Sequence, residues 1–563
     1  MQILTPSKVY DVCIVGSGAG GGMAAHVLTA GGADCLMLEA GPQWSVEKDG
    51  AMFKWNYDSP RRGAPHRVRP FGELDACLGG WDIAGEPYTV AEGSEFMWFR
   101  GRMLGGRTNH WGRISLRFGP HDFKARSRDG LGDDWPIGYD DLKPYYDRLD
   151  ELVGLFGSNE GILNEPDGIF LPPPKPRAYE LLVKKACDGL GVTCIPSRIA
   201  ILTRPHHGRA ACHYCAQCGR GCSSHSFFTS PTVLLPPALA TGKLRLVTGA
   251  MAREVLTDAE GRCTGVSYVD TATGKVKEVR AKVVVLAAST CESARLLLNS
   301  RSSRFPNGLA NGSGAVGRNL TDSTGTSVRG HIPSLEALPP HNEDGTGNMH
   351  LYMPWWGDNQ KLDFPRGYHI EFGGGRRMPG YGFMSRVDKI NAGGYGKALK
   401  DDYRRYNGSI LGFAGRGEMI PNEGSYCEID PSVVDQWGTP ALRFHWKWSD
   451  TEVRQVKHMQ ETFRSIIDGL GGRPLDPMPG PDESYGISKG GEIIHEAGTT
   501  RMGTSPRTSV LNEWCQAHEV KNLFVTDAGP FVSNAHKNVT WTILALAWRT
   551  SEHIVDERRK GNL

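Results

Sequence analysis

The sequence predicts a protein of mixed α/β and α+β class, on three observations. A βαβ unit with a glycine-rich turn occupies residues 1–40. A continuous apolar run, typical of a buried parallel strand, recurs at 283–288, and residues 523–527 predict a further strand. Residues 325–490, by contrast, are rich in aromatic residues, glycine and proline, with mixed strand signals. We therefore expect an α/β domain assembled from separated stretches and a second domain interleaved with it.

The N-terminal unit has the features of a dinucleotide-binding site. The apolar strand Val12–Val15 leads directly into Gly16, Gly18 and Gly21, which fit G-x-G-x-x-G and open a helix. These glycines permit a tight turn and let the backbone approach a pyrophosphate at the positive end of that helix. A second apolar strand ends in Glu39, placed to accept a hydrogen bond from a ribose hydroxyl. The combination predicts a dinucleotide site, against the alternative of a glycine-rich turn without a ligand.

Composition and charge exclude several classes of function. The chain has 563 residues and 39% hydrophobic content, enough for a large core in two or more domains. Its net charge of +2 gives no electrostatic reason to expect nucleic acid or an anionic membrane as a partner. No apolar run reaches the ~18–20 residues of a membrane span. Residues 1–10 do not resemble a signal peptide. The location is therefore expected to be cytoplasmic, unless another protein carries the chain out.

Other stretches predict individual elements. Residues 41–95 have few helical or strand periods and predict a long covering loop. Tyr139–Leu155 has helical spacing with acidic residues at its start. Leu244–Ala287 predicts a meander of short strands joined by two glycine-containing turns. Leu523–Asp527 predicts a strand, and Thr540–Val555 an amphipathic helix near the end of the chain.

Six stretches, spread over the whole chain, make it similar to the glucose–methanol–choline (GMC) family of flavoprotein oxidoreductases. They are Gly16–Gly21 with Glu39, Gly101–Gly106, Val285–Ser289, Gly317–Leu320, His495–Gly503 and Asn522–Ala528. The resemblance implies FAD, held by a Rossmann-like FAD-binding domain, and a substrate domain whose antiparallel sheet covers the isoalloxazine ring. We assign residues 1–125, 201–324 and 491–563 to the FAD-binding domain, and 126–200 and 325–490 to the substrate domain.

The same resemblance implies which residues contact FAD. They are Gly16, Gly18, Gly21, Glu39, Arg102, Gly105, Gly106, Asn109, His110, Ala288 and Asp527. The Gly105-Gly106 pair would also allow close backbone approach to a flat ligand. His110 matches a histidine that carries covalent flavin in the pyranose-oxidase branch, although Asn109 stands here in place of a threonine. We expect His110 to contact the flavin, with a covalent bond as the less favoured alternative.

Two residues match the catalytic pair of the family. Oxidation of an alcohol requires that its hydroxyl proton pass to a base while hydride leaves for flavin N5. His495 occupies the position of the family's active-site histidine, and imidazole suits this step because its ordinary pKa is about 6.5. Asn538 occupies the second position, where its amide can hydrogen-bond the substrate oxygen. A shift in register would place His536 there instead.

Four of the thirteen cysteines fall within eleven residues, in the pattern C-x2-C-x2-C-x3-C. They are Cys212, Cys215, Cys218 and Cys222. The spacing resembles the bacterial ferredoxin run without its final proline, and an iron–sulfur cluster is the predicted occupant. Structural zinc and disulfides are the alternatives. The other nine cysteines are scattered and predict small buried side chains.

Within the GMC family, the cysteine run resembles that of bacterial sugar dehydrogenase catalytic subunits, such as those of glucoside 3-dehydrogenase, FAD glucose dehydrogenase and fructose dehydrogenase. That resemblance implies a [3Fe-4S] centre with Cys215 as the spare cysteine, or [4Fe-4S] if all four bind iron. It also implies a sugar or glycoside substrate, and cytochrome c or a quinone as the electron acceptor. A small companion subunit that carries the export signal would then place the protein in the periplasm.

These points together predict an FAD-dependent dehydrogenase that oxidises a secondary or hemiacetal hydroxyl of a sugar or glycoside, with C3 of a glycoside preferred. Trp355-Trp356, Trp446 and Trp448 could stack on sugar rings, although core tryptophans are commoner. One rival function is an oxygen-using GMC oxidase with structural zinc at the cysteines. The other is a non-redox lyase that keeps its flavin only for structure.

Overall fold

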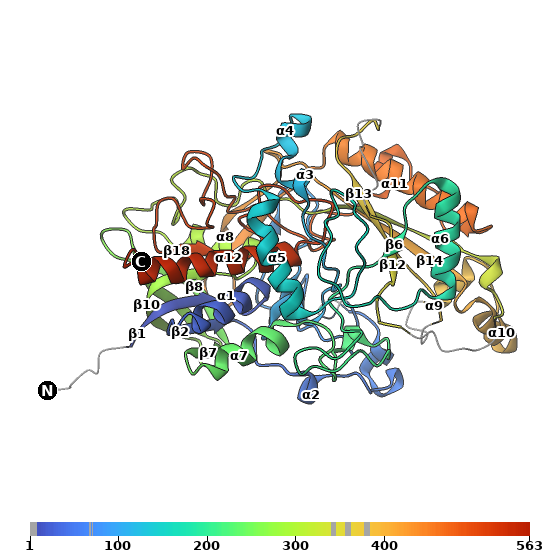
Figure 1. Cartoon of the computed structure of the whole chain (residues 1–563), viewed down its shortest axis with the longest axis horizontal. Helices are drawn as coiled ribbons and strands as arrows, with labels where there is room; N and C mark the ends of the chain where they lie inside the picture. Colours follow the sequence, from blue (N-terminus) through green and yellow to red (C-terminus); the bar gives the residue numbers. More distant parts are fainter. Residues whose placement is uncertain (1–7, 67–68, 70, 339–344, 355–361, 377–382) are drawn as a thin grey trace.

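A seven-stranded sheet contains strands from both ends of the chain (Figure 1). The computed structural model describes residues 8–66, 69, 71–338, 345–354, 362–376 and 383–563. The strand order is β7-β2-β1-β10-β9-β8, with β18 beside β10. The strands are β1 (Val9–Val15), β2 (Cys35–Glu39), β7 (Leu244–Thr248), β8 (Ala250–Thr257), β9 (Cys263–Asp270), β10 (Lys275–Leu286) and β18 (Leu523–Val525). Strands β1, β2, β7, β18 and the second half of β10 are parallel, as the apolar runs predict.

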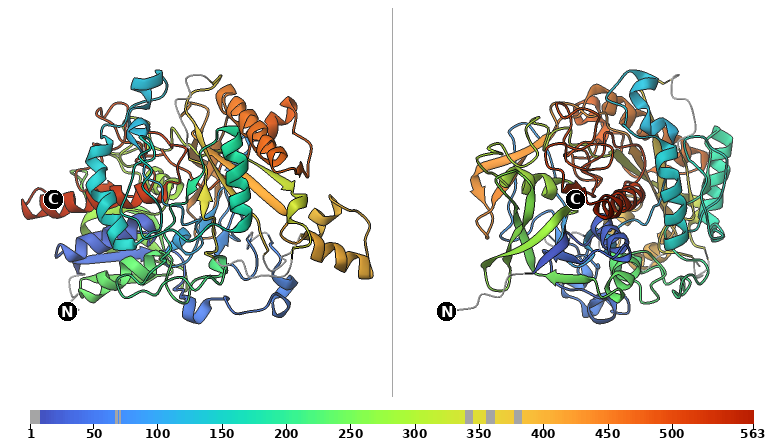
Figure 2. Two further views of the ribbon diagram at one scale, coloured as in Figure 1. Left: turned by 45° about the vertical axis from the view of Figure 1, so that its right-hand side comes forward. Right: turned by 60° about the vertical axis from the view of Figure 1, so that its left-hand side comes forward.

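The parallel strands are buried on both faces. Val12 and Ile14 enter one hydrophobic cluster, whereas Cys13 and Val15 enter another, because successive side chains of a strand point to opposite faces. Helices α1 and α12 pack side by side on this sheet, and α5 packs against α12 (Figure 2). The helices of this half are α1 (Ala19–Ala30), α5 (Tyr139–Val153), α7 (Leu235–Ala240), α8 (Thr290–Asn299) and α12 (Thr540–Arg559).

The meander predicted over Leu244–Ala287 is present from β8 to β10, whereas β7, at its start, pairs in parallel with β2 at the opposite edge of the sheet, and the last strand is longer than expected. Strands β8, β9 and β10 are antiparallel neighbours, joined by turns at the two predicted glycine-containing segments. Strand β10 has 12 residues: its first half pairs with β9, and its second half pairs with β1 and β18. One strand therefore joins the hairpin to the parallel sheet.

A second, four-stranded antiparallel sheet has the order β13-β14-β11-β17 and lies on the right in Figure 1. Its strands are β11 (Thr324–His331), β13 (Tyr368–Gly373), β14 (Ile410–Gly417) and β17 (Arg473–Pro474). Helix α11 (Asp450–Gly469) packs on this sheet, and α6 (Ala178–Leu190) packs on α11. Together they enclose a separate hydrophobic cluster. This two-sheet architecture confirms the predicted α/β plus α+β class.

Smaller sheets connect distant parts of the chain. Strand β4 (Thr89–Val90) pairs with β16 (Pro440–His445), which forms a hairpin with β15 (Tyr426–Val434). Strand β6 (Ile195–Pro196) pairs with β12 (Leu351–Tyr352), and β3 (Gly79–Gly80) with β5 (Arg100–Gly101). The remaining α-helices are α2 (Val46–Asp49), α3 (Pro120–Phe123), α4 (Ala125–Asp129), α9 (Phe383–Asp388) and α10 (Gly396–Tyr406). No described helix is long and apolar enough to cross a membrane.

Candidate active site

A cavity of about 420 Å³ opens at the carboxyl ends of the parallel strands, with Val15, Leu38 and Ala287 in its wall. Ligands of open α/β sheets bind at this edge. Ten of the predicted site residues line the cavity: Gly16, Gly18, Glu39, Arg102, Gly106, His110, Ala288, His495, Asp527 and Asn538. The fold therefore brings the N-terminal glycine motif and the C-terminal catalytic pair together.

The glycine-rich turn leaves its backbone open toward the cavity at one position. A Cβ atom at Gly20 would lie 2.0 Å from the Thr526 carbonyl oxygen, and one at Gly21 would lie 2.0 Å from the Gly16 carbonyl oxygen, so packing requires both glycines. A Cβ atom at Gly18 would meet nothing within 4 Å, and Gly18 lines the cavity. Gly18 therefore leaves the space that a closely approaching pyrophosphate needs.

Three helices begin at the wall of the cavity. Ala19, Thr290 and Thr540, the first residues of α1, α8 and α12, all line it. Helix N-termini carry unpaired N–H groups and the positive end of the helix dipole, both of which favour an anion. The sequence motif indicated only α1, because α8 and α12 reach the cavity through tertiary folding. The cavity thus suits an anionic ligand such as a dinucleotide pyrophosphate.

The carboxylate of Glu39 is held at the end of β2. It accepts hydrogen bonds from the Ser17 backbone N–H at 3.2 Å, from the Ser17 hydroxyl and from the Gly41 N–H at 2.8 Å. Burial raises the pKa of Glu39 above its ordinary value, although these hydrogen bonds oppose the rise. Its position is therefore fixed at the place where a ribose would lie on the first βαβ unit.

Two arginines in the cavity wall are held by carboxylates. Arg102 lies between Glu86, at 2.7 Å, and Glu292. Arg107 pairs with Glu496 at 2.6 Å. These ion pairs neutralise the guanidinium groups and fix their positions, so the positive ends of the helices remain the main attraction for an anion.

His495 and Asn538 meet in the same wall. Nε2 of His495 lies 3.4 Å from Nδ2 of Asn538, and Nδ1 lies 2.9 Å from the Ser323 hydroxyl oxygen. With an amide N–H directed at Nε2, the imidazole proton belongs on Nδ1, where it is donated to Ser323. The backbone N–H of His495 also donates to Asp322, at 2.9 Å. The Nε2 lone pair thus accepts from the Asn538 amide, and both residues line the cavity.

The surroundings keep the imidazole of His495 uncharged. Burial and the positive charge of Arg416 lower the pKa of His495 to about 3, against the opposing effect of Glu371. A neutral imidazole can accept a proton, which is the role of a general base.

Sequence reasoning missed a charged group that the second sheet places beside this pair. Glu371 on β13 accepts from Nδ2 of Asn538 at 3.4 Å and pairs with Arg416 on β14 at 3.2 Å. His369 Nε2 lies 3.2 Å from the same carboxylate. Burial alone would raise the pKa of Glu371, but Arg416, His369 and His495 lower it to about 2. The period-two alternation of β13 could indicate that positions 369 and 371 share a face, but not what that face meets.

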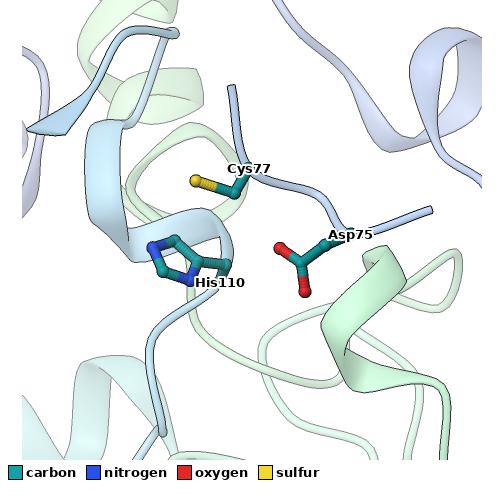
Figure 3. Close-up of side chains that lie close together, drawn as sticks. All are labelled: Asp75, Cys77 and His110. Carbon is teal, nitrogen blue, oxygen red and sulfur yellow. The ribbon is translucent and has the colours of Figure 1, made fainter. Parts of the chain in front are cut away.

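His110 lies in the cavity wall and belongs to a group of three side chains that could each offer an atom to a metal ion. Its imidazole lies with the Asp75 carboxylate and the Cys77 thiol, one atom of each within 4.8 Å of the others (Figure 3). Nε2 of His110 is buried without a hydrogen-bond partner among the described residues. Burial, Arg113 and Arg107 lower the pKa of His110 to about 3. Within the described residues this is the one such group of possible metal ligands.

The four-cysteine segment lies behind the cavity wall. All thirteen cysteines fall within the described residues and are free, and the nine outside this segment are buried, as predicted. Cys218 is buried in a hydrophobic cluster that Cys212 and Cys222 also contact, whereas Cys215 does not belong to it. No three of the four thiols lie mutually within 4.8 Å. Cys212, Cys218 and Cys222, which share this hydrophobic environment, are the three that the sequence predicts as iron ligands if Cys215 is spare.

Backbone hydrogen bonds connect this segment to the cavity wall. The Ala76 N–H donates to the Gly219 carbonyl at 2.7 Å, and Arg113 donates to the Cys218 carbonyl at 2.9 Å. Asp75, which precedes Ala76, lines the cavity. The backbone of the cysteine segment is therefore hydrogen-bonded to chain that adjoins the cavity wall.

Several predicted residues lie off the cavity wall. Gly21 packs inside its own turn, and a Cβ atom at Gly105 would meet Pro231 at 2.4 Å. Asn109 donates to the Leu104 carbonyl at 2.8 Å and lines a different cavity. These residues shape the turns that carry the wall rather than lining it.

Trp446, Trp448 and His536, which were considered for substrate stacking or catalysis, all lie outside the cavity wall. Trp446 is buried in the main core, and Trp448 packs against it at 4.9 Å between ring centroids, so neither lies in the cavity wall. Trp355-Trp356 lies outside the described residues. His536 is buried, with Nε2 at 3.0 Å from Glu165, so Asn538 rather than His536 lines the cavity.

Comparison with known proteins agrees with this architecture. The chain is 29% identical to a 2-methyl-1,2-propanediol dehydrogenase from Mycolicibacterium austroafricanum, over 98% of this chain and 96% of that protein. It is 24% identical to the fructose dehydrogenase large subunit of Gluconobacter japonicus, over 98% of each chain. The solved pyridoxine 4-oxidase from Mesorbium loti has the same fold, with a TM-score of 0.63 and 18% identity over 97% of this chain and 99% of that one.

Two family models match the sequence in the expected order. The N-terminal GMC oxidoreductase model matches residues 18–324 and the C-terminal one matches residues 421–547. The first match alone covers more than half of the chain and includes most of the seven-stranded sheet. The chain belongs to the GMC oxidoreductase family, and it is a flavin-dependent oxidoreductase that acts on CH–OH groups.

Proposed function

We propose that this protein is an FAD-dependent dehydrogenase that oxidises a hydroxyl group of a sugar or glycoside and passes the electrons to an external acceptor. The observation that carries the proposal is the arrangement of three sites. The glycine motif and the His495–Asn538 pair share one cavity, and the cysteine segment is hydrogen-bonded to the chain that forms its wall. An oxidase that uses oxygen would need only the first two.

The cavity fits FAD by its own chemistry. Open space at Gly18 and the three helix N-termini suit the pyrophosphate, and Glu39 suits a ribose hydroxyl. Gly106, His110, Ala288 and Asp527 would contact the rest of the cofactor. When bound here, FAD supplies the hydride acceptor. We favour a non-covalent contact at His110, because its ring is confined by Phe71 and Phe99 at 5.0 and 5.1 Å.

The catalytic roles follow from the geometry of the pair. The neutral His495 takes the hydroxyl proton on Nε2, while Nδ1–H stays on Ser323. When the alcohol binds, the Asn538 N–H that is directed at Nε2 turns to the substrate oxygen. This exchange frees the Nε2 lone pair for the hydroxyl proton and orients the alcohol. Glu371 accepts from the Asn538 amide at 3.4 Å and so limits its rotation.

The cysteine segment fits an iron–sulfur cluster in donor chemistry. A single zinc ion needs all its ligand atoms at contact distance, whereas the thiolates of a cluster bind different iron atoms and stay farther apart. No three of the thiols lie mutually within 4.8 Å, which disfavours a single zinc ion in this arrangement, and the C-x2-C-x2-C-x3-C run is what supports the cluster. Cys212, Cys218 and Cys222 would hold [3Fe-4S], with Cys215 spare. The group supplies a one-electron acceptor next to a two-electron site.

Substrate, partners and location are proposed from relatives. Relatives along nearly the whole chain include the fructose dehydrogenase large subunit, a gluconate 2-dehydrogenase flavoprotein and a paromamine 6'-oxidase. A C-glycoside 3-oxidase matches over 53% of this chain. We propose a sugar or glycoside substrate with oxidation at C3 preferred, a small companion subunit that carries the export signal, and a periplasmic location. The acceptor is cytochrome c or a quinone.

Anaerobic mixing with candidate sugars and glycosides tests the function. Bleaching of the flavin, slow return of its colour in air with equally slow release of peroxide, and rapid return with cytochrome c or a quinone would support a dehydrogenase. Rapid peroxide release in air would support the oxidase instead. A flavin that stays oxidised with every sugar, glycoside and simple alcohol would favour the lyase.

A further inference from the structure

A group of three possible metal ligands lies at the edge of the flavin cavity, apart from the catalytic pair. Asp75 and Cys77 belong to one stretch of chain just before β3, and His110 follows the short 3-10 helix Gly106–Asn109 (Figure 3). One ligand atom of each side chain lies within 4.8 Å of the other two. The four cysteines of the 212–222 segment do not belong to this group. Two separate loops therefore bring a carboxylate, a thiol and an imidazole together.

Two of these side chains have polar atoms without a partner. Oδ1 of Asp75 and Nε2 of His110 are both buried, and neither has a hydrogen-bond partner among the described residues. Burial raises the pKa of Asp75 to about 7, against the opposing charge of Arg113. Buried polar atoms without partners cost stability. An ion coordinated by the carboxylate and the imidazole would remove part of that cost.

Backbone hydrogen bonds hold both loops in place. The N–H of Ala76, between the first two ligands, donates to the Gly219 carbonyl at 2.7 Å. The N–H of His110 donates to the Arg107 carbonyl at 3.2 Å. Ligand atoms of a tetrahedral zinc site lie about 3.3–3.8 Å apart, as bonds of about 2.0–2.3 Å require. The three side chains would therefore need to close by at most about 1.5 Å on a framework that is already formed.

The donor set and its charge suit a zinc ion. Thiolate, imidazole and carboxylate are the three side-chain ligands that Zn²⁺ takes in proteins, and three protein ligands leave a fourth position for water. Asp75 and His110 line the flavin cavity, so that position can be filled from the cavity side. A thiolate and a carboxylate together carry two negative charges. These charges equal that of the ion, which therefore adds no net charge beside Arg107 and Arg113.

We propose that Asp75, Cys77 and His110 bind one Zn²⁺ ion, which holds the loop before β3 against the turn of His110. As the ion binds, the Cys77 thiol gives its proton to water, and nothing is oxidised or reduced. One ring nitrogen of His110 coordinates the ion, and the other side of the ring remains for the flavin. The inference depends on neither the proposed substrate nor the proposed electron acceptor.

Equilibrium dialysis of the purified holoenzyme against Zn²⁺, followed by metal analysis, tests the site. The wild type should retain one zinc ion per chain. X-ray absorption at the zinc edge should show one sulfur ligand at about 2.3 Å and nitrogen or oxygen ligands at about 2.0–2.2 Å. Zinc bound by three or four sulfur atoms would place the ion at the cysteine segment and overturn the proposal. Protein that retains no zinc would overturn it as well.

Substitutions assign the ligands. Cys77→Ser and Asp75→Asn should each lower the affinity for zinc by about a hundredfold or more, because each removes a charged ligand. Cys515→Ser is the matched control: its thiol is also buried and hydrogen-bonds Thr550, and zinc binding should be unchanged. Equal zinc affinity in Cys77→Ser, Asp75→Asn and the wild type would contradict the assignment.

Thermal unfolding with and without zinc tests the link between the two loops in the same proteins. Zinc should raise the midpoint of the wild type and of Cys515→Ser, because a ligand that binds only the folded chain stabilises it. It should leave Cys77→Ser and Asp75→Asn at their own zinc-free midpoints. A wild-type midpoint that does not respond to bound zinc would overturn the stabilising role. Because no step needs an alcohol or an acceptor, failure of the proposed function would leave these results unaffected.

Discussion

The side-chain amide nitrogen of Asn538 lies 3.4 Å from Nε2 of His495. An alcohol oxygen bound beside both atoms can lose its proton to one residue while it accepts a hydrogen bond from the other. The same amide nitrogen lies 3.4 Å from Glu371, so the second sheet helps to set its direction.

Replacement of His495 by alanine should lower kcat by a factor of about 10²–10⁴, the usual contribution of a positioned base. Flavin content should stay unchanged, because binding of FAD depends on the glycine turn and the helix N-termini. Ser323→Ala, which removes only the hydrogen bond to Nδ1, is the matched control and should have a smaller effect. Flavin bleaching under anaerobic conditions measures both. A near-normal rate in His495→Ala would contradict the assignment.

The pH dependence should reflect the lowered pKa of His495, about 3. An imidazole is an active base only above its pKa, so the wild type should lose no activity to His495 between about pH 5 and pH 7. Arg416→Met removes the cation that, after burial, lowers this pKa most, while Glu371 remains. The acid limb of kcat/KM should therefore move up from about 3, and burial should keep it below about 6.5.

Arg416→Lys keeps the positive charge and is the control for that experiment; its acid limb should stay near that of the wild type. An acid limb near 6.5 in the wild type would mean that the surroundings of His495 do not lower its pKa.

Loss of the buried cation Lys537 should destabilise the fold around Asn538. Lys537 is fully buried and pairs with Asp122 at 2.8 Å and with Glu165 at 3.7 Å. Lys537→Met would leave these carboxylates without their cation, which costs about 3–5 kcal/mol of unfolding free energy. Thermal unfolding measures the loss. Lys521→Met, on an exposed loop, should leave the midpoint unchanged, and an equal effect of both substitutions would argue against a buried ion-pair network.

The cysteines should divide into ligands and a spare. Cys218→Ser should lose iron and nearly all transfer to cytochrome c or quinone, while flavin reduction by substrate continues at the wild-type rate. Cys215→Ser should keep its iron, because Cys215 alone lies outside the hydrophobic cluster that the other three contact. Iron analysis and stopped-flow reduction of each variant measure these effects. Full iron content in Cys218→Ser would rule out its role as a ligand.

Two glycines of the first turn should respond differently to alanine. In Gly20→Ala the new Cβ atom would lie 2.0 Å from the Thr526 carbonyl oxygen, so α1 must shift from the chain that follows β18, at about 1–3 kcal/mol of stability. In Gly18→Ala the new methyl group meets no protein atom within 4 Å and points to open space. That variant should unfold at the wild-type temperature but bind FAD more weakly. Melting temperature and flavin content separate the two outcomes.

The sequence predicts the local elements well where their pattern is contiguous. The βαβ unit, the helix that begins at Tyr139 and the one that begins at Thr540 all lie where the periodicity places them. Helix α11 was not expected, although Ser449 and Glu452 form a capping box and Val456, Met459 and Phe463 follow at helical spacing. The capping box and the helical spacing are therefore readable in the sequence, within the aromatic and glycine-rich residues 325–490.

The site was predicted only as far as family motifs extend. Glu371 and Arg416 stand beside the catalytic pair because β13 and β14 are neighbours in the second sheet, and no short motif encodes that pairing. The division of the chain into two domains remains a prediction.

The central claim is that this chain holds a flavin and an iron–sulfur cluster within electron-transfer distance of each other. The most direct test is the absorption and EPR spectra of anaerobically purified protein, with an iron assay, before and after addition of substrate. We expect flavin bands, about three to four iron atoms per chain and a cluster signal that changes with substrate. Protein that is yellow but free of iron after anaerobic purification would contradict the account.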